Sequence, residues 1–208
     1  MMNVCYNCGE YRADKIIDPG GPYAICPICG YKHAFIQAPL LFVCGPSGAG
    51  KSTLCQTLAG KMDEVVMLDG DVLWRPEFAT QEDNFRDFFE TWLRLSKNIS
   101  QSGRPVVLFI AGAIPENVEP CVERSYFSQV HYLALVCDDE VLAERLRRRP
   151  RWRQSNDERF IAEQLRFNRW LTQRGSRASP PIELIETSGE SVEKSVEKVA
   201  GWIREKIL

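Results

Sequence analysis

The sequence predicts an α/β protein in which a five-stranded parallel sheet carries helices on both faces and a small cysteine module precedes it. Three observations predict this fold class. From Leu40 onward, apolar segments of strand length alternate with segments of helical pattern, as in parallel sheets with crossover helices. A glycine-rich run joins the first strand to the first helix, and two cysteine pairs open the chain. With 208 residues, 44% of them apolar and 26% charged, the chain can bury a full core and carry one appendage.

The elements are expected in a regular order. The apolar runs that predict strands are Leu40–Cys44, Val65–Leu68, Pro105–Ala111, Val130–Val136 and Glu183–Glu186. The segments that predict helices are Lys51–Lys61, Asp83–Gln101, Asp138–Arg148, Asp157–Gln173 and Val192–Ile207. We therefore expect two domains, the cysteine module in residues 1–37 and the sheet domain in residues 38–208.

The glycine-rich run matches the pattern G-x-x-x-x-G-K-[ST] and directly follows the apolar segment Pro39–Cys44. Its glycines let backbone N–H groups turn inward around phosphate oxygens, and the following helix points its positive dipole end at them. Lys51 is expected to reach the β and γ oxygens, and the Ser52 hydroxyl to hold Mg²⁺. We therefore predict ATP binding; a glycine-rich turn with a surface lysine is the alternative. The expected nucleotide-binding residues are Gly45, Pro46, Ser47, Gly48, Ala49, Gly50, Lys51, Ser52 and Thr53.

Two carboxylates follow the second predicted strand, where Val65–Leu68 runs into Asp69-Gly70-Asp71. This is the carboxyl edge of the sheet, where open α/β sheets bind ligands. Residues two apart in a strand share a face, so both carboxylates are expected to look toward the phosphates. We expect Asp69 to hold the hydration shell of Mg²⁺ and Asp71 to orient or deprotonate a substrate hydroxyl. An Asp-Gly turn that only ends the strand is the alternative.

These two motifs resemble those of a known family. Gly45 to Ser52, followed by Leu68-Asp69-Gly70-Asp71-Val72-Leu73, looks like the small P-loop kinases, especially adenylylsulfate kinase and gluconate kinase. The pattern also resembles that of the nucleoside monophosphate kinases, and shikimate kinase and chloramphenicol phosphotransferase share it more distantly. The resemblance extends from about Leu40 to the last residue. It implies the three-layer P-loop NTPase fold, with the P-loop strand in the middle of the sheet. It also implies Mg²⁺-dependent transfer of the ATP γ-phosphoryl group to a small acceptor.

An arginine-rich segment, Leu142–Arg153, contains six arginines. In similar kinases this position is the lid that closes over ATP, and its arginines supply charge to the phosphoryl group and stack on adenine. Arg145 and Arg149 lie one helical turn apart and are the predicted catalytic pair. A solvated basic helix end is the alternative.

The loop that follows the last predicted strand is Thr187-Ser188-Gly189-Glu190. In similar kinases the loop at the edge of the adenine lies here, so Ser188 is a candidate nucleotide contact. Capping of the last helix by Ser188 explains the sequence equally well.

Aromatic residues crowd the segment that covers the acceptor pocket in similar kinases. Four of them recur at helical spacing, which favours core packing over ligand contact. Trp74 and Phe78 precede that helix and are the better candidates for stacking on a flat acceptor. Arg75 and Arg86 are either contacts for an anionic acceptor or plain surface charges. The residues with helical spacing are Phe85, Phe88, Phe89 and Trp92.

The cysteine module contains the pattern C-x-x-C-G twice. The spacing fits a zinc ribbon with one structural Zn²⁺, whereas two disulfides are the alternative and nothing in the chain indicates secretion. Because a segment of this length lacks a core, metal binding is expected to supply much of its folding free energy. The predicted zinc ligands are Cys5, Cys8, Cys26 and Cys29.

The sequence is compatible with two roles for the ribbon. It either docks on the kinase-like domain and shapes the acceptor pocket, or it recruits a protein or nucleic-acid partner. If the ribbon recruits a partner, an exposed contact patch is expected at Tyr31, His33 and Phe35. If it docks on the kinase-like domain, these three residues are expected to pack.

Composition narrows the function classes. The net charge of −2 argues against a general nucleic-acid binder. No apolar stretch approaches membrane-span length and no signal segment opens the chain, so a cytoplasmic location is expected. The leading interpretation is an ATP-dependent kinase of a small molecule, with nucleosides and nucleotides among the candidate acceptors. The alternative is an ATP-binding regulatory or adaptor protein whose ribbon recruits a partner. The Asp-Gly-Asp run favours the kinase.

Overall fold

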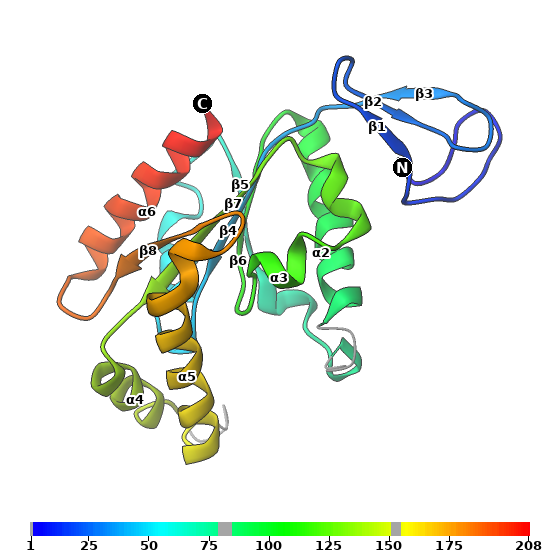
Figure 1. Cartoon of the computed structure of the whole chain (residues 1–208). Coiled ribbons are helices and arrows are strands. Elements are labelled where there is room, and N and C mark those ends of the chain that lie inside the picture. The colour runs from blue at the N-terminus through cyan, green and yellow to red at the C-terminus, as the bar shows by residue number, and fades with distance from the viewer. Residues whose placement is uncertain (1, 79–84, 151–154) are drawn as a thin grey trace.

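The computed structural model describes residues 2–78, 85–150 and 155–208. Its centre is a five-stranded sheet in the order β5-β6-β4-β7-β8, in which all neighbouring strands are parallel (Figure 1). The strand that leads into the glycine-rich run, β4, is the middle strand, as predicted. In chain order the strands are β4 (Leu40–Cys44), β5 (Val66–Asp69), β6 (Val106–Phe109), β7 (Val130–Val136) and β8 (Ile182–Glu186).

Helices cover both faces of this sheet (Figure 1). Helices α1 (Lys51–Leu58) and α6 (Val192–Ile207) pack on one face. Helices α2 (Arg86–Ile99), α3 (Pro115–Val118) and α5 (Glu158–Arg174) pack on the other. The remaining helix, α4 (Asp139–Arg147), packs against α5. The three-layer α/β fold expected from the alternating pattern is therefore confirmed.

The middle strand β4 is buried on both faces, which explains its uninterrupted apolar sequence. Leu40, Phe42 and Cys44 lie in the core that α2 and α5 cover. Leu41 and Val43 point the other way, into the core under α1 and α6. Successive side chains of a strand alternate between faces, so five residues anchor both halves of the domain.

Most differences from the predicted boundaries have local causes. Helix α1 ends at Leu58 rather than Lys61, because Gly60 adopts a left-handed φ of 74° that stops the helix. Helix α2 ends at Ile99, and its predicted start at Asp83 lies outside the described residues. The short helix α3 was not predicted, although Pro115 in its first turn is a start signal.

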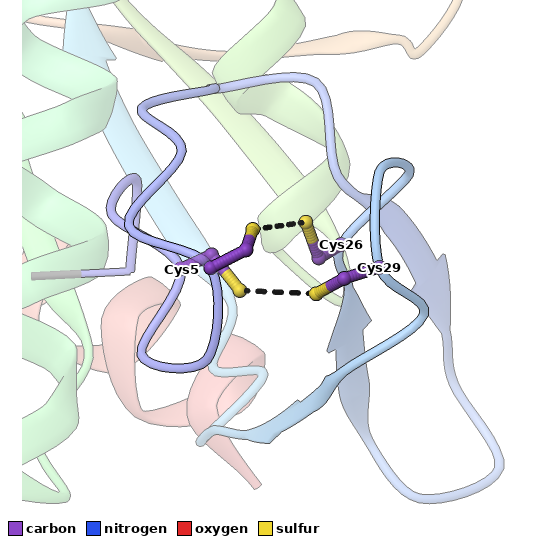
Figure 2. Close-up of side chains that lie close together, drawn as sticks. Cys5, Cys26 and Cys29 are labelled. Carbon is purple, nitrogen blue, oxygen red and sulfur yellow. Dashed lines mark hydrogen bonds between the residues drawn. The ribbon is translucent and has the colours of Figure 1, made fainter.

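The N-terminal module is a ribbon of three short antiparallel strands in the order β1-β2-β3. They are β1 (Ile16–Asp18), β2 (Tyr23–Ile25) and β3 (Lys32–Ala34). One tight turn before β1 carries Cys5 and Cys8, and a second turn between β2 and β3 carries Cys26 and Cys29. The two turns bring the four cysteine sulfurs of the ribbon together (Figure 2). The Sγ atoms of Cys5 and Cys29 lie 3.6 Å apart, and those of Cys8 and Cys26 lie 3.8 Å apart. All four sulfurs lie within 4.8 Å of one another.

The ribbon docks on the sheet domain against α2 and the 3₁₀ turn Val122–Tyr126. Phe35 is buried and its ring meets that of Tyr126 edge-on at 5.8 Å. The Tyr126 hydroxyl donates a hydrogen bond of 2.7 Å to the Ala13 carbonyl. Gln101 binds both the N–H and the C=O of Ile36, at 2.8 and 3.1 Å. His33 is buried beside the Tyr31 ring, whereas Tyr31 itself is 42% exposed. The packing alternative is therefore confirmed for His33 and Phe35 but not for Tyr31.

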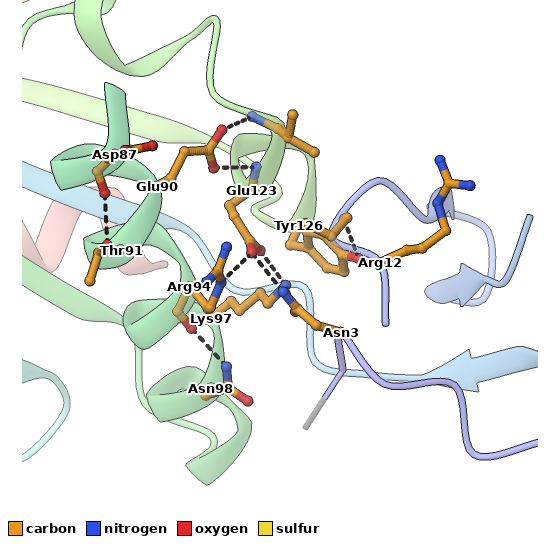
Figure 3. A network of polar contacts seen from close by, with 12 residues as sticks. Asn3, Arg12, Asp87, Glu90, Thr91, Arg94, Lys97, Asn98, Glu123 and Tyr126 are labelled. Atoms are coloured by element: carbon orange, nitrogen blue, oxygen red, sulfur yellow. Dashed lines mark hydrogen bonds and ion pairs between the residues drawn. The ribbon is translucent and has the colours of Figure 1, made fainter. Parts of the chain in front are cut away.

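A buried ionic network closes this contact (Figure 3). Glu123 is fully buried and pairs with Lys97, which is 1% exposed. Asn3 of the ribbon accepts a hydrogen bond from Lys97 at 2.5 Å and donates one to Glu123 at 2.9 Å. Arg94 adds a second cation at 2.9 Å from Glu123, and the Lys97 ammonium lies 3.6 Å from the centre of the Tyr126 ring. Because Lys97 and Glu123 have little access to water, each depends on its partners.

We expect Lys97→Met to lower the free energy of unfolding by about 3–5 kcal/mol, because it leaves the Glu123 carboxylate buried with one cation fewer. Urea denaturation measures the change. Arg204→Met is the control: Arg204 pairs with Glu64 at 3.0 Å on the surface, and this loss is expected to stay below about 1 kcal/mol. A Lys97→Met variant as stable as the control would show that the network contributes nothing. Adding Glu123→Gln to Lys97→Met is expected to restore part of the stability.

Candidate active site

The glycine-rich loop forms at the carboxyl end of β4, between this strand and α1. Gly45 has a φ of 133°, and a Cβ atom there would lie 2.3 Å from the carbonyl oxygen of Leu135 on β7. Gly48 has a φ of 93°, and a Cβ atom there would lie 2.9 Å from Leu142 on α4. Both positions therefore require glycine, for backbone conformation and for close approach. The loop leaves the N-terminus of α1 open, with Ser52 and Thr53 exposed in its first turn.

Lys51 folds back along this loop. Its Nζ donates hydrogen bonds to the carbonyl oxygens of Gly45 at 2.7 Å and Pro46 at 3.0 Å. Burial lowers the pKa of Lys51 to about 8, and nearby Arg149 lowers it further, whereas the carboxylates of Asp71 and Asp69 oppose the shift. The loop lysine, one arginine of the segment after α4 and both carboxylates therefore lie within electrostatic reach of one another.

The two carboxylates do not share a strand face, and this part of the prediction was wrong. Strand β5 ends at Asp69, and Gly70 opens a 3₁₀ turn that runs to Leu73. The Asp69 side chain accepts a hydrogen bond of 3.0 Å from the Asp71 N–H and so caps this turn. Asp71 is exposed and lines a cavity, while Asp69 stays at the strand end. The turn-capping alternative thus describes Asp69, and the turn itself aims Asp71 at the cavity.

A cavity of about 910 Å³ opens beside the glycine-rich loop. Small and aliphatic residues after β6 form its floor. Its aromatic lining, from the segment after β5, from α2 and from α5, consists of Trp74, Phe85, Phe88, Phe89, Phe160 and Phe167. Its polar lining consists of Ser47, Asp71, Asn117, Glu163 and Gln164.

The aromatic segment serves both core and cavity. Trp92 is fully buried, as its helical spacing predicts. Phe88 and Phe89 belong to the core and also line the cavity. Trp74 is 48% exposed and meets Phe88 edge-on at 5.3 Å, in agreement with its place outside the helix. Phe78 packs on the core and on Phe88 but is not among the lining residues.

Helix α5 also lines the cavity, a role that was not predicted from the sequence. Gln164 accepts a hydrogen bond of 2.8 Å from the backbone N–H of Ser47 in the glycine-rich loop. Buried Asn168 accepts from the Cys137 N–H at 3.3 Å and donates to the Cys137 carbonyl at 2.6 Å. These bonds fix α5 to both the loop and the end of β7. The signal in the sequence is the spacing of Phe160, Gln164 and Phe167, which places them on one helix face.

The predicted arginine pair separates in the structure. Arg145 donates hydrogen bonds to the Thr187 hydroxyl at 3.2 Å and to the Thr187 carbonyl at 2.8 Å, in the loop after β8. Arg149 instead lies near enough to Lys51 to lower its pKa. Two further arginines of the segment, Arg151 and Arg153, lie outside the described residues.

Ser188 is not the cap of the last helix. That position belongs to Ser191, whose hydroxyl accepts from the Lys194 N–H at 3.4 Å. The Ser188 hydroxyl accepts from the Asp138 N–H at 2.5 Å and donates to Glu186 at 2.6 Å. It therefore ties the loop after β8 to the start of α4.

The cysteine cluster of the ribbon has the donor set and spacing of a tetrahedral metal site. Four thiolates at about 2.3 Å from Zn²⁺ stand about 3.8 Å apart, close to the sulfur separations observed in the two facing pairs. A hydrogen bond from the Asn7 side chain, with one from the Tyr31 backbone, lowers the pKa of Cys29 to about 6. The backbone N–H of Cys29 lowers the pKa of Cys26. Within the ribbon Cys26 and Cys29 thus have a lowered pKa, whereas the pKa of Cys8 is raised to about 12. Burial raises the pKa of the core thiol Cys44 to about 12, so this thiol stays protonated at neutral pH.

Comparison with known proteins places the sheet domain in a family. A family model described as an AAA domain matches residues 41–166. A sugar kinase from Janibacter sp. HTCC2649 has a TM-score of 0.60 at 19% identity, over 80% of this chain and 95% of that one. A gluconokinase from Sinorhizobium meliloti 1021 has a TM-score of 0.59 at 20% identity, over 83% and 95%. A shikimate kinase from Acinetobacter baumannii, solved with shikimate, has a TM-score of 0.50 at 19% identity, over 82% and 96%.

No curated protein sequence matches this chain. Among the described residues, no helix combines the length and the apolar character that a membrane crossing requires. The family match covers more than half of the chain and includes the glycine-rich loop, both carboxylates and most of α5. The chain therefore belongs to the AAA domain family, and its fold is that of the small P-loop kinases.

Proposed function

We propose that this protein transfers the γ-phosphoryl group of ATP to a small acceptor, with nucleosides and nucleotides among the candidates. One observation carries the proposal: Asp71 lies in the lining of a cavity of about 910 Å³ that also includes Ser47 of the P-loop. A nucleotide switch needs no second cavity beside its phosphate loop, whereas a kinase needs one for the acceptor. The fold shared with a sugar kinase, a gluconokinase and a shikimate kinase supports this choice.

Different residues are proposed to bind the phosphates, to hold Mg²⁺ and to accept the proton. Backbone N–H groups of the P-loop cradle the phosphates, and Lys51 and Arg149 neutralise their charge. Ser52 and Asp69 are proposed to hold Mg²⁺; the chemistry that this ion supplies when bound is charge neutralisation on the transferring group. Asp71 accepts the proton of the attacking hydroxyl.

The nucleotide base is proposed to lie against the loop after β8. Arg145 binds that loop through Thr187, and Ser188, a residue of the loop, ties it to Glu186 and Asp138. A planar guanidinium held in this way offers one face for stacking on adenine. Thr53, in the first turn of α1, is proposed to contact the α-phosphate.

The ribbon is proposed to be a separate zinc-binding domain in residues 1–37, with the kinase domain in residues 38–208. Cys5, Cys8, Cys26 and Cys29 would hold one structural Zn²⁺ as a closed set of four thiolates. A closed set leaves no position for substrate, so the metal would stabilise the ribbon and take no part in transfer.

We expect Arg145→Met to weaken ATP binding about tenfold, because the guanidinium that faces the base and fixes Thr187 is lost. Isothermal titration calorimetry with a non-hydrolysable ATP analogue measures the change. Arg148→Met is the matched control from the same helix end, since Arg148 is exposed and its ion pair among the described residues is with Glu144 at 2.5 Å. Equal affinities for the two variants would remove Arg145 from the site.

The proposal is tested by incubating the protein with Mg²⁺, γ-labelled ATP and a pooled panel of nucleosides, nucleotides, sugars and hydroxy acids. We expect label in one class of acceptor, and none with Lys51→Ala. Clear ATP binding without label in any acceptor would overturn the proposal and favour the regulatory or adaptor protein.

A further inference from the structure

We propose that the acceptor is an uncharged, flat-ringed alcohol of the nucleoside class, and that Glu163 excludes anionic acceptors such as nucleotides and sugar acids. This inference rests on the proposed function, because it describes what enters the cavity beside Asp71. Three features of the lining carry it: its aromatic walls, the sign of its charges and the position of its polar groups.

The aromatic walls come from two separate parts of the chain. One wall consists of Trp74, Phe85 and Phe88. The centre of the Trp74 ring lies 6.1 Å from that of Phe85 and 5.3 Å from that of Phe88. Phe160 and Phe167 of α5 form the other. Trp74 is 48% exposed, and Phe85, Phe160 and Phe167 are only partly buried, so ring surface remains uncovered. Uncovered aromatic faces on two sides favour a planar, apolar ring between them.

The charges of the lining have one sign. Asp71 and Glu163 are carboxylates, and within the described residues no lysine or arginine lines the cavity. Arg86, one of the sequence candidates for an anionic acceptor, donates to the Pro120 carbonyl at 2.7 Å and is not a lining residue. Arg75, the other candidate, is not a lining residue either. Recognition of a phosphate or carboxylate normally uses such cations, and the two carboxylates of the lining repel an anionic acceptor.

The polar side chains of the cavity lining can accept hydrogen bonds from donor groups of the acceptor. Asn117 donates from its amide nitrogen to the Gly112 carbonyl at 2.8 Å, which fixes the orientation of the side chain. Glu163 is exposed on the cavity side of α5, next to Gln164, which is bound to the P-loop. A carboxylate accepts hydrogen bonds from hydroxyl or amino groups and gives none when ionised. A nucleoside offers such donors on both its base and its sugar, without a negative charge.

The experiment compares acceptors that differ in charge or in the flat ring. Cytidine and adenosine are each paired with their 5′- and 3′-monophosphates, which add negative charge and each leave free the hydroxyl that the other blocks, and with ribose, which lacks the flat ring. The kcat/KM for phosphoryl transfer and the Kd in the presence of a non-hydrolysable ATP analogue are measured for each. We expect a nucleoside to exceed its monophosphate by about 100-fold in kcat/KM, as expected for like charges brought together, and ribose by at least about tenfold.

Charge-reversal variants assign the effect. Glu163→Lys is expected to reduce the preference for nucleoside over monophosphate at least tenfold, through tighter binding of the monophosphate. Glu197→Lys, an exposed charge reversal on α6, is expected to leave the ratio unchanged.

Two results overturn this inference and leave the kinase in place: transfer that prefers monophosphates or sugar acids, and an unchanged ratio in Glu163→Lys. Absence of transfer to every acceptor overturns the proposed function, and the Kd values then still decide the charge preference of the cavity.

Discussion

Asp71→Asn is expected to bind ATP as the wild type does and to transfer its phosphoryl group about 10²–10⁴ times more slowly. The carboxylate lies in the cavity lining, held there by a turn that Asp69 caps. Asparagine keeps the size and shape of this side chain but accepts no proton from an attacking hydroxyl. The loss is therefore expected in kcat, with little change in the affinity for either substrate.

Single-turnover transfer from γ-labelled ATP and calorimetric ATP binding measure the two quantities separately. Asp63→Asn, an exposed carboxylate in the turn before β5, is the control and is expected to retain full activity. Full transfer activity in Asp71→Asn would exclude this residue as the base. A parallel loss of ATP affinity would assign it to the nucleotide site instead.

Removal of zinc is the second large effect, and it is expected to unfold the ribbon. The only apolar cluster of the ribbon within the described residues is small, and it includes Tyr126 of the sheet domain. Structural Zn²⁺ contributes roughly 10–16 kcal/mol of binding free energy in small zinc modules, far more than such a cluster supplies. Loss of the ribbon also exposes the pair of Lys97 and Glu123, because Asn3 no longer covers it.

Elemental analysis is expected to give one zinc per chain, and chelation is expected to lower the Tm and abolish the circular dichroism of the ribbon. Cys8→Ser reproduces this effect without a chelator, and added Zn²⁺ restores the wild type but not the variant. A metal-free protein with an unchanged Tm would contradict the site. A mass lower by four hydrogens would instead establish the two disulfides.

Local patterns predicted much of the fold. The predicted segments located all five strands of the sheet. Strands β4, β6 and β7 are buried along most of their length, whereas the edge strands β5 and β8 are only partly covered. The P-loop was found through a contiguous pattern of eight residues, in which Gly45, Gly48 and Gly50 have positive φ values. The position of β4 in the middle of the sheet came from the family resemblance, since pairing between distant strands leaves no local signal.

Long-range contacts set what local patterns missed. Arg145 turns away from Arg149 because Thr187, 42 residues further on, binds its guanidinium. Gln164 joins the site because it meets Ser47 across 117 residues. The docking of the ribbon depends on Asn3 and Glu123, which are 120 residues apart. Each of these contacts joins side chains whose partners only the folded chain brings together.

The most direct test of a kinase is the ratio of ADP formed to acceptor phosphorylated, measured by mass spectrometry with Mg²⁺, ATP and a nucleoside. We expect one phosphorylated nucleoside for each ADP, and neither product at a comparable rate with Asp71→Asn. ADP that accumulates with inorganic phosphate alone, or ATP that stays bound and intact, would contradict phosphoryl transfer to an acceptor.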